Sequence, residues 1–298
     1  MSEQKILSVG LIGYGYWGKK LTRVLKDLGV LLAIADSQPS KLQEALDSGI
    51  MKAKHLLGCY EDLAEEELDA AVIATPPETH YQVAKWVLEN GLHAFIEKPL
   101  TTRYEEAKEL EELAMRKNLT LQVGHIYLHS AALKAIPIPV GPARLHVRLL
   151  NKEGPPSSST RDILWAGLPH ALSVALHFFN TMPWKVEAWS REGTVYVHLD
   201  WFGRDRGAWL EVGDYTGERA RQVELRMGDE LYHFTADRPG FLHKVQEGIE
   251  VYGTEPLVAE EPLVTEMKHF LESPGVDSMG SKVVRIIERV VSCLLPVH

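Results

Sequence analysis

The sequence is poor in cysteine, has no excess of basic residues and lacks long hydrophobic runs. Its two cysteines, Cys59 and Cys293, give neither a disulfide framework nor a CxxC pair, so we expect buried thiols in a reducing cytosol. With 32 Lys and Arg against 41 Asp and Glu, the net charge is −9, and no basic run could follow a phosphate backbone. These features argue against a nucleic-acid partner.

No apolar run is long enough to cross a bilayer. The first residues, MSEQKILSVG, also lack the basic start and the long apolar core of a signal peptide. We therefore expect a cytoplasmic protein without a membrane partner. A chain of 298 residues that is 45% hydrophobic can build two domains, each with its own core.

Residues 1–122 alternate between apolar strand patterns and helical patterns. This alternation predicts an α/β domain with a doubly wound parallel sheet. Thr102 and Glu105 have the spacing of a capping box at the start of one helix. The expected strands are residues 6–13, 30–36, 55–60, 69–77, 92–99 and 119–125.

Residues 123–298 instead contain many strand patterns joined by short turns, which predicts an α+β domain with a large, mostly antiparallel open sheet. Residues 163–179 and 281–295 are the expected helices, and residues 152–160 read as a mobile surface loop. The expected strands are residues 143–150, 185–191, 194–202, 207–215, 221–228 and 230–237.

A glycine cluster follows the first expected strand and opens the first helix. Gly13, Gly15 and Gly18 have the spacing G-x-G-x-x-G, which lets backbone N–H groups meet the pyrophosphate of a dinucleotide. Tyr16 and Trp17, inside the same turn, are further candidates for cofactor contact. The alternative is a tight turn without a ligand, and the surrounding strand–helix–strand pattern favours the cofactor.

Asp36 ends the second expected strand, where a carboxylate can accept hydrogen bonds from an adenosine ribose. A carboxylate would repel a 2′-phosphate, and no arginine follows it, so NAD is favoured over NADP. Ser37 and Lys41 lie nearby and keep NADP as the less favoured alternative. Asp36 could instead cap the next helix.

The segment ATPPETH follows another central strand, at the edge of the sheet where ligands bind. Its alternative interpretation is a proline-rich turn capped by Thr79. The cofactor candidates in this segment are Thr75, Pro76, Pro77 and His80.

Three motifs in order, GLIGYGYWGKK, AVIATPPETH and FIEKPLTT, resemble the glucose-fructose oxidoreductase, inositol dehydrogenase and rhizopine-catabolism family, Gfo/Idh/MocA. The likeness is strong over residues 6–125 and looser beyond. It implies a Rossmann domain followed by a mixed domain whose open sheet often forms an oligomer interface. It also implies that nicotinamide and a small sugar-like substrate bind between the domains, in a homodimer or homotetramer.

The resemblance places a substrate-contacting, proton-transferring lysine at Lys98, with Glu97 and Pro99 fixing the end of the strand. A desolvated lysine beside an oxidised nicotinamide would have a lowered pKa and could accept a hydroxyl proton. Its alternative is a solvated lysine at a strand edge. The family motif favours the catalytic role, in addition to cofactor contact by Glu97 and Lys98.

The resemblance places a second proton-handling residue at His170, in the stretch WAGLPHA. A histidine on an apolar helix is more often structural, and His177 illustrates that case. Many relatives carry acidic residues on both sides of this histidine, where the present chain has Ala166 and Ala171. Their absence raises doubt about the substrate and, less strongly, about activity.

His125 and Tyr127 follow the last strand of the first domain and are candidates for substrate contact. His125 could instead cap that strand. His125 and His129 have the i, i+4 spacing of a metal pair, but no third ligand is convincing nearby, so we predict no metal site.

The leading hypothesis is an NAD-dependent oxidoreductase that transfers hydride between the nicotinamide and a secondary alcohol or ketone of a sugar, sugar nucleotide or cyclitol. The stretches VGHIYL and WAGLPH are nearest to the branch of sugar-nucleotide 3-dehydrogenases. The alternative is a nucleotide-binding regulatory protein that has lost catalysis. A third possibility is a reductase of a non-sugar carbonyl or imine, which is less favoured because such relatives often lack the EKP triplet.

Overall fold

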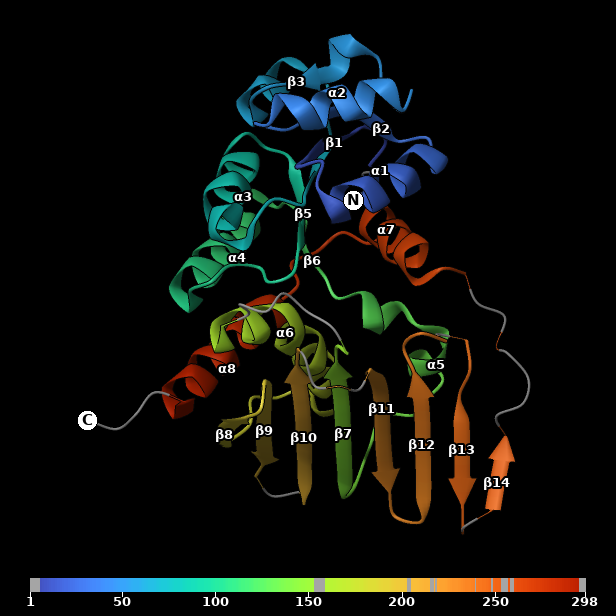
Figure 1. Cartoon of the computed structure of the whole chain (residues 1–298). Coiled ribbons are helices and arrows are strands. Elements are labelled where there is room, and N and C mark those ends of the chain that lie inside the picture. Colours follow the sequence, from blue (N-terminus) through green and yellow to red (C-terminus); the bar gives the residue numbers. More distant parts are fainter. Residues whose placement is uncertain are drawn as a thin grey trace. The chain divides into compact units, whose positions relative to one another are not determined.

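The computed structural model describes residues 6–152, 159–202, 205–214, 217, 219–238, 240–247, 249–252, 257 and 260–294. The chain forms two compact units, each with its own sheet (Figure 1). The first unit contains Met1–Gly124 and Leu263–Val284, and the second contains His125–Pro262 and Arg285–His298. The sequence assigned all of residues 123–298 to the second domain, whereas residues 263–284 fold with the first.

The first unit contains a six-stranded parallel sheet in the order β3-β2-β1-β4-β5-β6. The chain moves outward from β1 to β3 and then crosses to β4 and outward again, which is the doubly wound arrangement expected from the sequence. The order reverses between β1 and β4, where such sheets bind ligands at the carboxyl ends of their strands. Its strands are β1 (Val9–Ile12), β2 (Leu31–Ala35), β3 (Leu56–Leu57), β4 (Ala70–Ile73), β5 (His93–Glu97) and β6 (Leu121–Gly124).

Helix α1 of this unit buries one apolar face, through Leu21, Val24 and Leu25. The capping box expected at Thr102 is wrong, because α4 begins at Tyr104 with Arg103 as its N-cap residue. The helices are α1 (Tyr16–Asp27), α2 (Pro39–Asp47), α3 (His80–Glu89), α4 (Tyr104–Lys117), α7 (Pro262–Glu272) and α8 (Met279–Leu294), and short 3-10 turns span Ala53–His55, Tyr60–Glu65 and Pro77–Thr79. The last residues of α8 belong to the second unit.

Helix α7 and the segment after it join the first unit through its edge strand β6. The Leu121 amide donates to the carbonyl of Gly275, and the Gln122 side chain donates to the carbonyl of Ser273. On α7, the ring of Phe270 lies 5.6 Å from that of Phe95 on β5. These contacts explain why a segment distant in sequence completes the first unit.

The second unit contains an eight-stranded sheet in the order β14-β13-β12-β11-β7-β10-β9-β8. Strands β7 and β10 run parallel, and the other neighbouring pairs run antiparallel. The mostly antiparallel sheet expected from the sequence is therefore confirmed. Its strands are β7 (Ala143–Leu150), β8 (Lys185–Arg191), β9 (Thr194–Trp201), β10 (Arg206–Gly213), β11 (Ala220–Met227), β12 (Glu230–Thr235), β13 (His243–Gln246) and β14 (Ile249–Tyr252).

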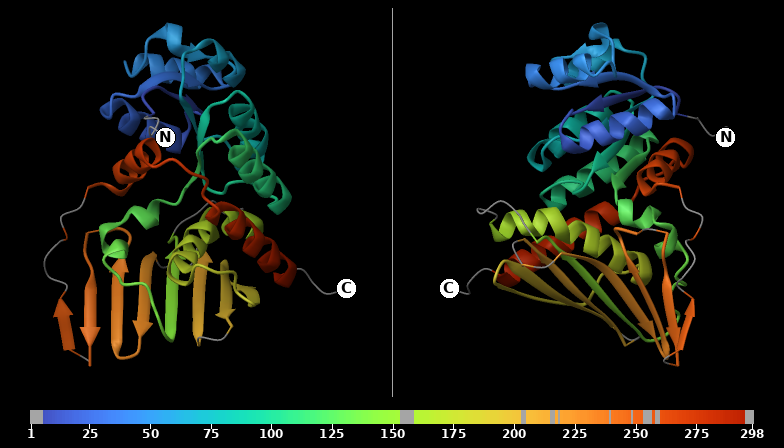
Figure 2. Two further views of the ribbon diagram at one scale, coloured as in Figure 1. Left: turned by 180° about the vertical axis from the view of Figure 1, so that it is seen from behind. Right: turned by 45° about the vertical axis from the view of Figure 1, so that its right-hand side comes forward.

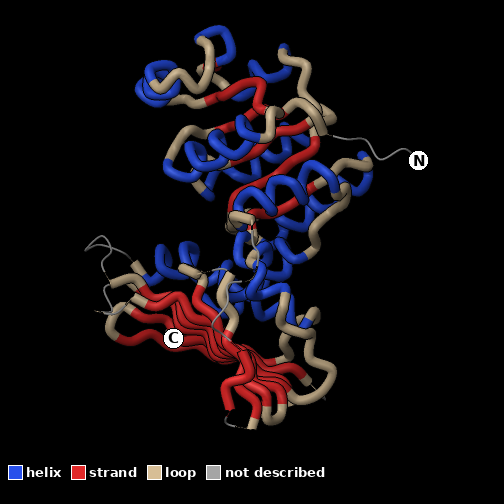
Figure 3. Tube along the Cα trace, turned by 90° about the vertical axis from the view of Figure 1, so that its right-hand side faces the viewer, coloured by secondary structure: helices blue, strands red, loops and turns tan. Residues whose placement is uncertain are grey.

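Helix α6 (Thr160–Phe179) packs on one face of this sheet, against β7, β9 and β10 (Figure 2). A Cβ atom at Gly167 would lie 3.1 Å from the Cβ of Val212 on β10, so glycine permits close packing there. The edge-on view in Figure 3 shows helices on one side of the strands. On the other side, which we call the open face, no helix of the described residues covers the strands. The unit also contains the 3-10 turn Ile126–His129 and helix α5 (Ala131–Lys134).

Helix α6 begins with a capping box in which the hydroxyl of Ser159 and the carboxylate of Asp162 bond each other's backbone N–H groups. Most of the loop predicted at residues 152–160 lies outside the described residues. The expectation of buried thiols is wrong, because Cys59 and Cys293 are both exposed. No helix within the described ranges is sufficiently long and apolar to cross a membrane.

Candidate dinucleotide and catalytic site

The glycine turn between β1 and α1 has three distinct steric environments. Gly13 has φ +96°, and a Cβ there would lie 2.8 Å from the carbonyl oxygen of Ala74. A Cβ at Gly18 would lie 2.0 Å from the carbonyl oxygen of Gly13, so helix and turn pack too closely for any side chain. Around Gly15, in contrast, no atom of the described residues lies within 4 Å of a built Cβ. The turn thus leaves its one open position at Gly15, which fits the approach of a pyrophosphate.

Two aromatic residues begin α1 beside this turn. Tyr16 is 73% exposed, and the ammonium of Lys20 lies 4.3 Å and 4.4 Å from the ring centres of Tyr16 and Trp17. This cation and the N-terminus of α1 both favour negative charge near the glycine turn. Contact of either ring with a cofactor remains a prediction.

Asp36 lies directly after β2 and faces the glycine turn. Its Oδ2 accepts a hydrogen bond of 2.7 Å from the Tyr14 amide, and its Oδ1 accepts one of 2.8 Å from the Gln38 amide. The N-cap residue of α2 is Gln38, so the alternative interpretation of Asp36 as the cap of that helix is wrong. The carboxylate is held beside the turn by two backbone donors, and Ser37 next to it is exposed.

The segment after β4 is fixed by His80, which is 1% exposed. Its Nδ1 lies 2.7 Å from the carbonyl oxygen of Pro99, and its Nε2 lies 2.8 Å from the carbonyl oxygen of Thr75. Burial lowers the pKa of His80, although both carbonyl groups raise it. The ring therefore joins the loop after β4 to the loop after β5, and a direct contact with a cofactor stays a prediction.

Thr79 closes the proline-rich turn of ATPPETH, as the alternative interpretation of this segment expected. Its hydroxyl donates to the carbonyl of Pro76 at 2.7 Å and lies 2.8 Å from the hydroxyl of Thr75. These bonds close the turn that contains Pro77. Because β4 neighbours both β1 and β5, this turn lies at the same sheet edge as the glycine turn and Lys98.

Lys98 follows β5 at that edge and is half-buried. Loss of solvation lowers the pKa of its ammonium, and the neighbouring Glu97 carboxylate opposes this shift. Burial within the first unit is therefore sufficient to lower the pKa of this lysine, and its role in proton transfer stays a prediction. A lysine with a lowered pKa can exchange a proton with an alcohol more readily than a solvated one.

Two buried carboxyl groups of the first unit, Glu97 and Glu266, interact with each other. Burial raises the pKa of Glu97 to about 7, against the opposing effect of the Lys98 and Lys20 charges. Glu266 on α7 is 2% exposed, and burial together with the charge of Glu97 raises its pKa well above the usual range. The sequence analysis missed Glu266, although an acidic residue among the apolar, helically spaced residues of α7 was a usable signal.

The second unit brings Tyr127 and His170 together. Their rings are stacked, with centres 4.9 Å apart and planes 25° apart. Burial raises the pKa of Tyr127. His125, 2% exposed, precedes the 3-10 turn that contains Tyr127. Because Lys98 belongs to the first unit and His170 to the second, their cooperation stays a prediction.

The two alanines beside His170 differ in environment: Ala166 is exposed and Ala171 is fully buried. Burial lowers the pKa of His177 further along the same helix, and its ring lies 5.0 Å from that of Phe178. These properties agree with a structural role for His177. Across the described part of the chain, no group of three or more His, Cys, Asp and Glu side chains could hold a metal ion.

Comparison with known proteins shows which proteins this chain resembles. Residues 7–125 match the family described as "Oxidoreductase family, NAD-binding Rossmann fold" (GFO_IDH_MocA). The uncharacterized oxidoreductase YdgJ of Escherichia coli is 33% identical over 125 residues, which make up 40% of this chain and 34% of that protein. The UDP-N-acetylglucosamine 3-dehydrogenase of Acidithiobacillus ferrooxidans is 31% identical over 120 residues, 40% of this chain and 37% of that protein. The matches thus span about a third of the length of these relatives.

The likeness of the folds extends further than the likeness of the sequences. The solved structure of the Acidithiobacillus ferrooxidans enzyme superimposes with a TM-score of 0.86 over 97% of both chains, at 23% identity. At this identity the match shows the fold alone. Residues 7–125 and the motifs that they contain are thus similar to the Gfo/Idh/MocA family of oxidoreductases, which has an NAD-binding Rossmann fold.

Proposed function

We propose that this protein is an NAD-dependent oxidoreductase acting on a secondary alcohol or ketone of a sugar, sugar nucleotide or cyclitol. The observation that carries the proposal is the single sheet edge that holds the glycine turn, Asp36 and the desolvated Lys98. NAD would supply the hydride acceptor at its nicotinamide ring. The proposed cofactor contacts are Gly13, Gly15, Tyr16, Trp17, Gly18, Asp36, Ser37, Thr75, Pro76, Pro77, His80, Glu97 and Lys98.

The preference for NAD over NADP is part of this proposal and rests on Asp36. Two backbone amides donate to its carboxylate and hold it beside the glycine turn. A charged carboxylate beside the glycine turn can accept bonds from ribose hydroxyls and would repel a 2′-phosphate.

In the proposed reaction, Lys98 takes the hydroxyl proton as hydride leaves the carbon, and returns it in the reverse direction. Its lowered pKa makes the neutral amine accessible, and the nearby carboxyl of Glu97 limits how far the pKa falls. His170 would hold the reacting hydroxyl or share its proton, with its ring supported by the stacked Tyr127. His125 and Tyr127 are the other proposed substrate contacts.

The test is turnover measured by nicotinamide absorbance across sugars, cyclitols and nucleotide sugars. We expect Lys98→Met to lose at least about a hundredfold in kcat, the usual contribution of a general acid or base. Lys52→Met, at an exposed position of the same unit, is the matched control and should keep full activity. Absence of turnover on every substrate of the panel would contradict the proposal.

A second candidate is a nucleotide-binding regulatory protein without catalysis. Ala166 and Ala171 favour it, because the acidic residues that many relatives carry there are missing. Ala171 is fully buried, so this position offers no group to a substrate hydroxyl. NAD affinity without turnover, unchanged in Lys98→Met, would support this candidate. A large loss of turnover in the same variant would exclude it.

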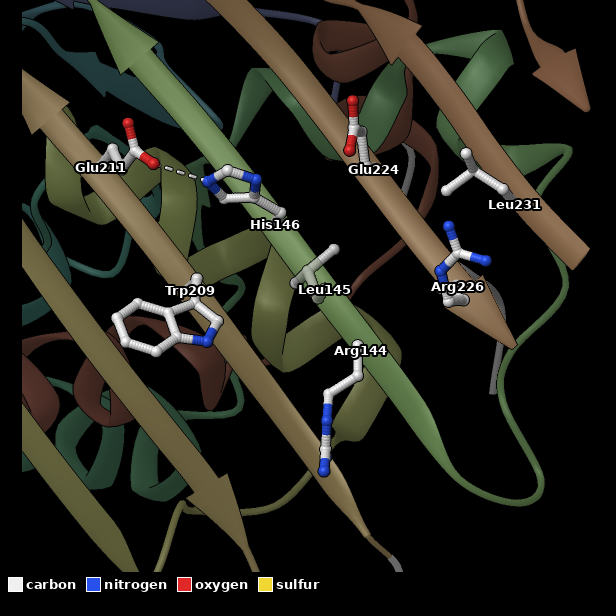
Figure 4. Close-up of a pocket in the computed structure, with 8 residues that line it drawn as sticks. All are labelled: Arg144, Leu145, His146, Trp209, Glu211, Glu224, Arg226 and Leu231. Carbon is white, nitrogen blue, oxygen red and sulfur yellow. Dashed lines mark hydrogen bonds and ion pairs between the residues drawn. The ribbon is translucent and has the colours of Figure 1, made fainter. Parts of the chain in front are cut away.

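We also propose that the open face of the eight-stranded sheet forms a homodimer or homotetramer interface. Trp189 and Trp209 are each 43% exposed on this face, and the ring of His198 stacks on Trp209 at 4.4 Å. Figure 4 shows Trp209 beside His146, which bonds Glu211 at 2.7 Å. Sedimentation analysis tests the interface: Trp209→Glu should shift an oligomer toward the monomer, and a monomeric wild-type protein would refute it.

A further inference from the structure

The second unit contains a pocket of about 310 Å³ where β11 begins and β12 ends. Its lining is unusual for an acidic chain, because cationic and imidazole side chains dominate. These are Arg219, Arg221, Arg238, His233 and His243, with Asp237 as the acidic residue of the lining. With neutral histidines, the charged lining side chains carry 3 − 1 = 2 net positive charges. The whole chain, in contrast, has a net charge of −9.

Two of the arginines are held in place by the fold. Arg221 donates to the carbonyl of Leu150 at 2.8 Å and also bonds the side-chain oxygen of Asn151. Arg219 forms a two-point ion pair with Asp237, at 2.9 Å and 3.3 Å. A planar guanidinium has five donors, so such arginines retain N–H groups for a second acceptor. Arg238 is exposed at the rim of the same pocket.

The histidines lie opposite each other on neighbouring strands, His233 on β12 and His243 on β13. Their ring centres are 6.0 Å apart. Burial and the nearby His243 lower the pKa of His233, while Glu224 raises it. A bound anion would oppose the lowering of the His233 pKa, because a nearby opposite charge favours the protonated ring.

The pocket is close to the predicted substrate residues of the same unit. The charges of Arg221, Asp237 and Arg219 all act on the hydroxyl of Tyr127. Tyr127 in turn stacks on His170. An anionic group bound in the pocket could therefore be part of the same ligand that presents its sugar to His170.

We propose that this pocket binds the diphosphate group of a phosphate-bearing sugar substrate, with Arg219, Arg221 and Arg238 as its main contacts. The inference rests on the proposed function and narrows it to sugar nucleotides among the candidate substrates. Arginine suits the role because its fork of donors matches phosphate oxygens in two-point contacts. An uncharged cyclitol or free sugar would leave these groups without a partner.

The first test is calorimetric titration of the full chain with inorganic pyrophosphate, in saturating NAD so that the dinucleotide site of the first unit is filled. We expect binding that weakens about tenfold in Arg238→Gln and in Arg219→Gln, because each removes a charge-assisted hydrogen bond. Arg191→Gln is the matched control, since it removes an exposed arginine from β8 of the same sheet. Arg238→Lys keeps the charge and should recover part of the affinity.

The second test compares KM for a nucleotide diphosphate sugar with KM for the uncharged sugar. Arg238→Gln should raise the first about tenfold with little change in kcat, and leave the second unchanged. Equal effects on both substrates would overturn the inference. Failure of the wild-type protein to bind pyrophosphate would also overturn it. Binding that is unchanged in both variants would overturn it too, because the pyrophosphate would then occupy another site or the pocket would be covered by a second copy of the chain.

The two proposals fail separately. Pyrophosphate binding that is lost in Arg238→Gln, in a protein with no turnover on any sugar, would support the pocket and refute the oxidoreductase. Turnover that is lost in Lys98→Met but unchanged in the variants of the pocket arginines would support the oxidoreductase and refute the pocket.

Discussion

Replacing Glu97 with glutamine is expected to stabilise the protein at pH 8 and to change its stability little at pH 5. The carboxyl group is 8% exposed, and burial raises its pKa from 4.5 to about 7. Since the folded state binds this proton more tightly than the unfolded state, the stability that the group contributes is fully present below the unfolded pKa. It is lost as the pH rises through the folded pKa.

The magnitude follows from the size of the shift. Because the pKa rises from 4.5 to about 7, full ionisation of the side chain lowers the free energy of unfolding by about 3.4 kcal/mol. At pH 5 about 1 kcal/mol of this cost is already present, and at pH 8 almost all of it is. Glutamine is nearly isosteric and stays neutral, so its advantage over glutamate should grow by about 2.5 kcal/mol between the two pH values.

Urea unfolding of the ligand-free protein at pH 5 and pH 8, followed by circular dichroism, measures this difference. Glu111→Gln is the matched control, because Glu111 is a buried carboxylate paired with Lys108 at 2.9 Å and bonded by the Ser281 amide. Its loss should destabilise the protein at pH 8. If Glu97→Gln changed stability equally at both pH values, the reasoning from burial would be refuted.

Three further predictions concern the cofactor edge. Gly15→Ala should change the free energy of unfolding by no more than about 0.5 kcal/mol, because the added Cβ enters open space. It should nevertheless weaken NAD binding at least about tenfold, and an unchanged affinity in a calorimetric titration would contradict the approach of the pyrophosphate to Gly15. Asp36→Asn should reduce the NAD-to-NADP preference in kcat/KM by at least about tenfold, and a constant ratio would remove the argument from charge. His80→Ala should lower the free energy of unfolding, measured in urea, by about 2 kcal/mol and also weaken NAD binding, because it removes the hydrogen bonds to the loops at Pro99 and Thr75. An effect on stability alone would show that NAD binding does not need these two hydrogen bonds.

Much of the fold of the first unit could be predicted from local sequence patterns. The alternation of apolar runs and helical periods predicted the parallel sheet, and the glycine spacing predicted the turn at Gly13 to Gly18, because both signals are contained within short stretches of chain. For Lys98 the position after a strand left a solvated and a desolvated lysine equally open, and only the family motif favoured the lysine with a lowered pKa. Local pattern failed at Thr102, since the capping-box spacing occurs there without the helix start that would use it.

Contacts between segments that are distant in the sequence could not be predicted from such local patterns. Helix α7 completes the first unit by pairing its following segment with β6, so Glu266 lies near Glu97 although 169 positions separate them, 266 − 97. The exposure of both cysteines and the hydrogen bond from the Tyr14 amide to Asp36 depend equally on how separate segments of the chain pack.

The sequence by itself determined the class of fold, the order of the motifs and the residue types available at the cofactor edge, because short-range periodicity and turn chemistry encode these. Only the tertiary structure decided which carboxyls lose their solvent, which carbonyls hold His80 and which arginines line the pocket at the start of β11. Desolvation and electrostatic coupling depend on three-dimensional packing, and packing brings together residues that the sequence keeps apart.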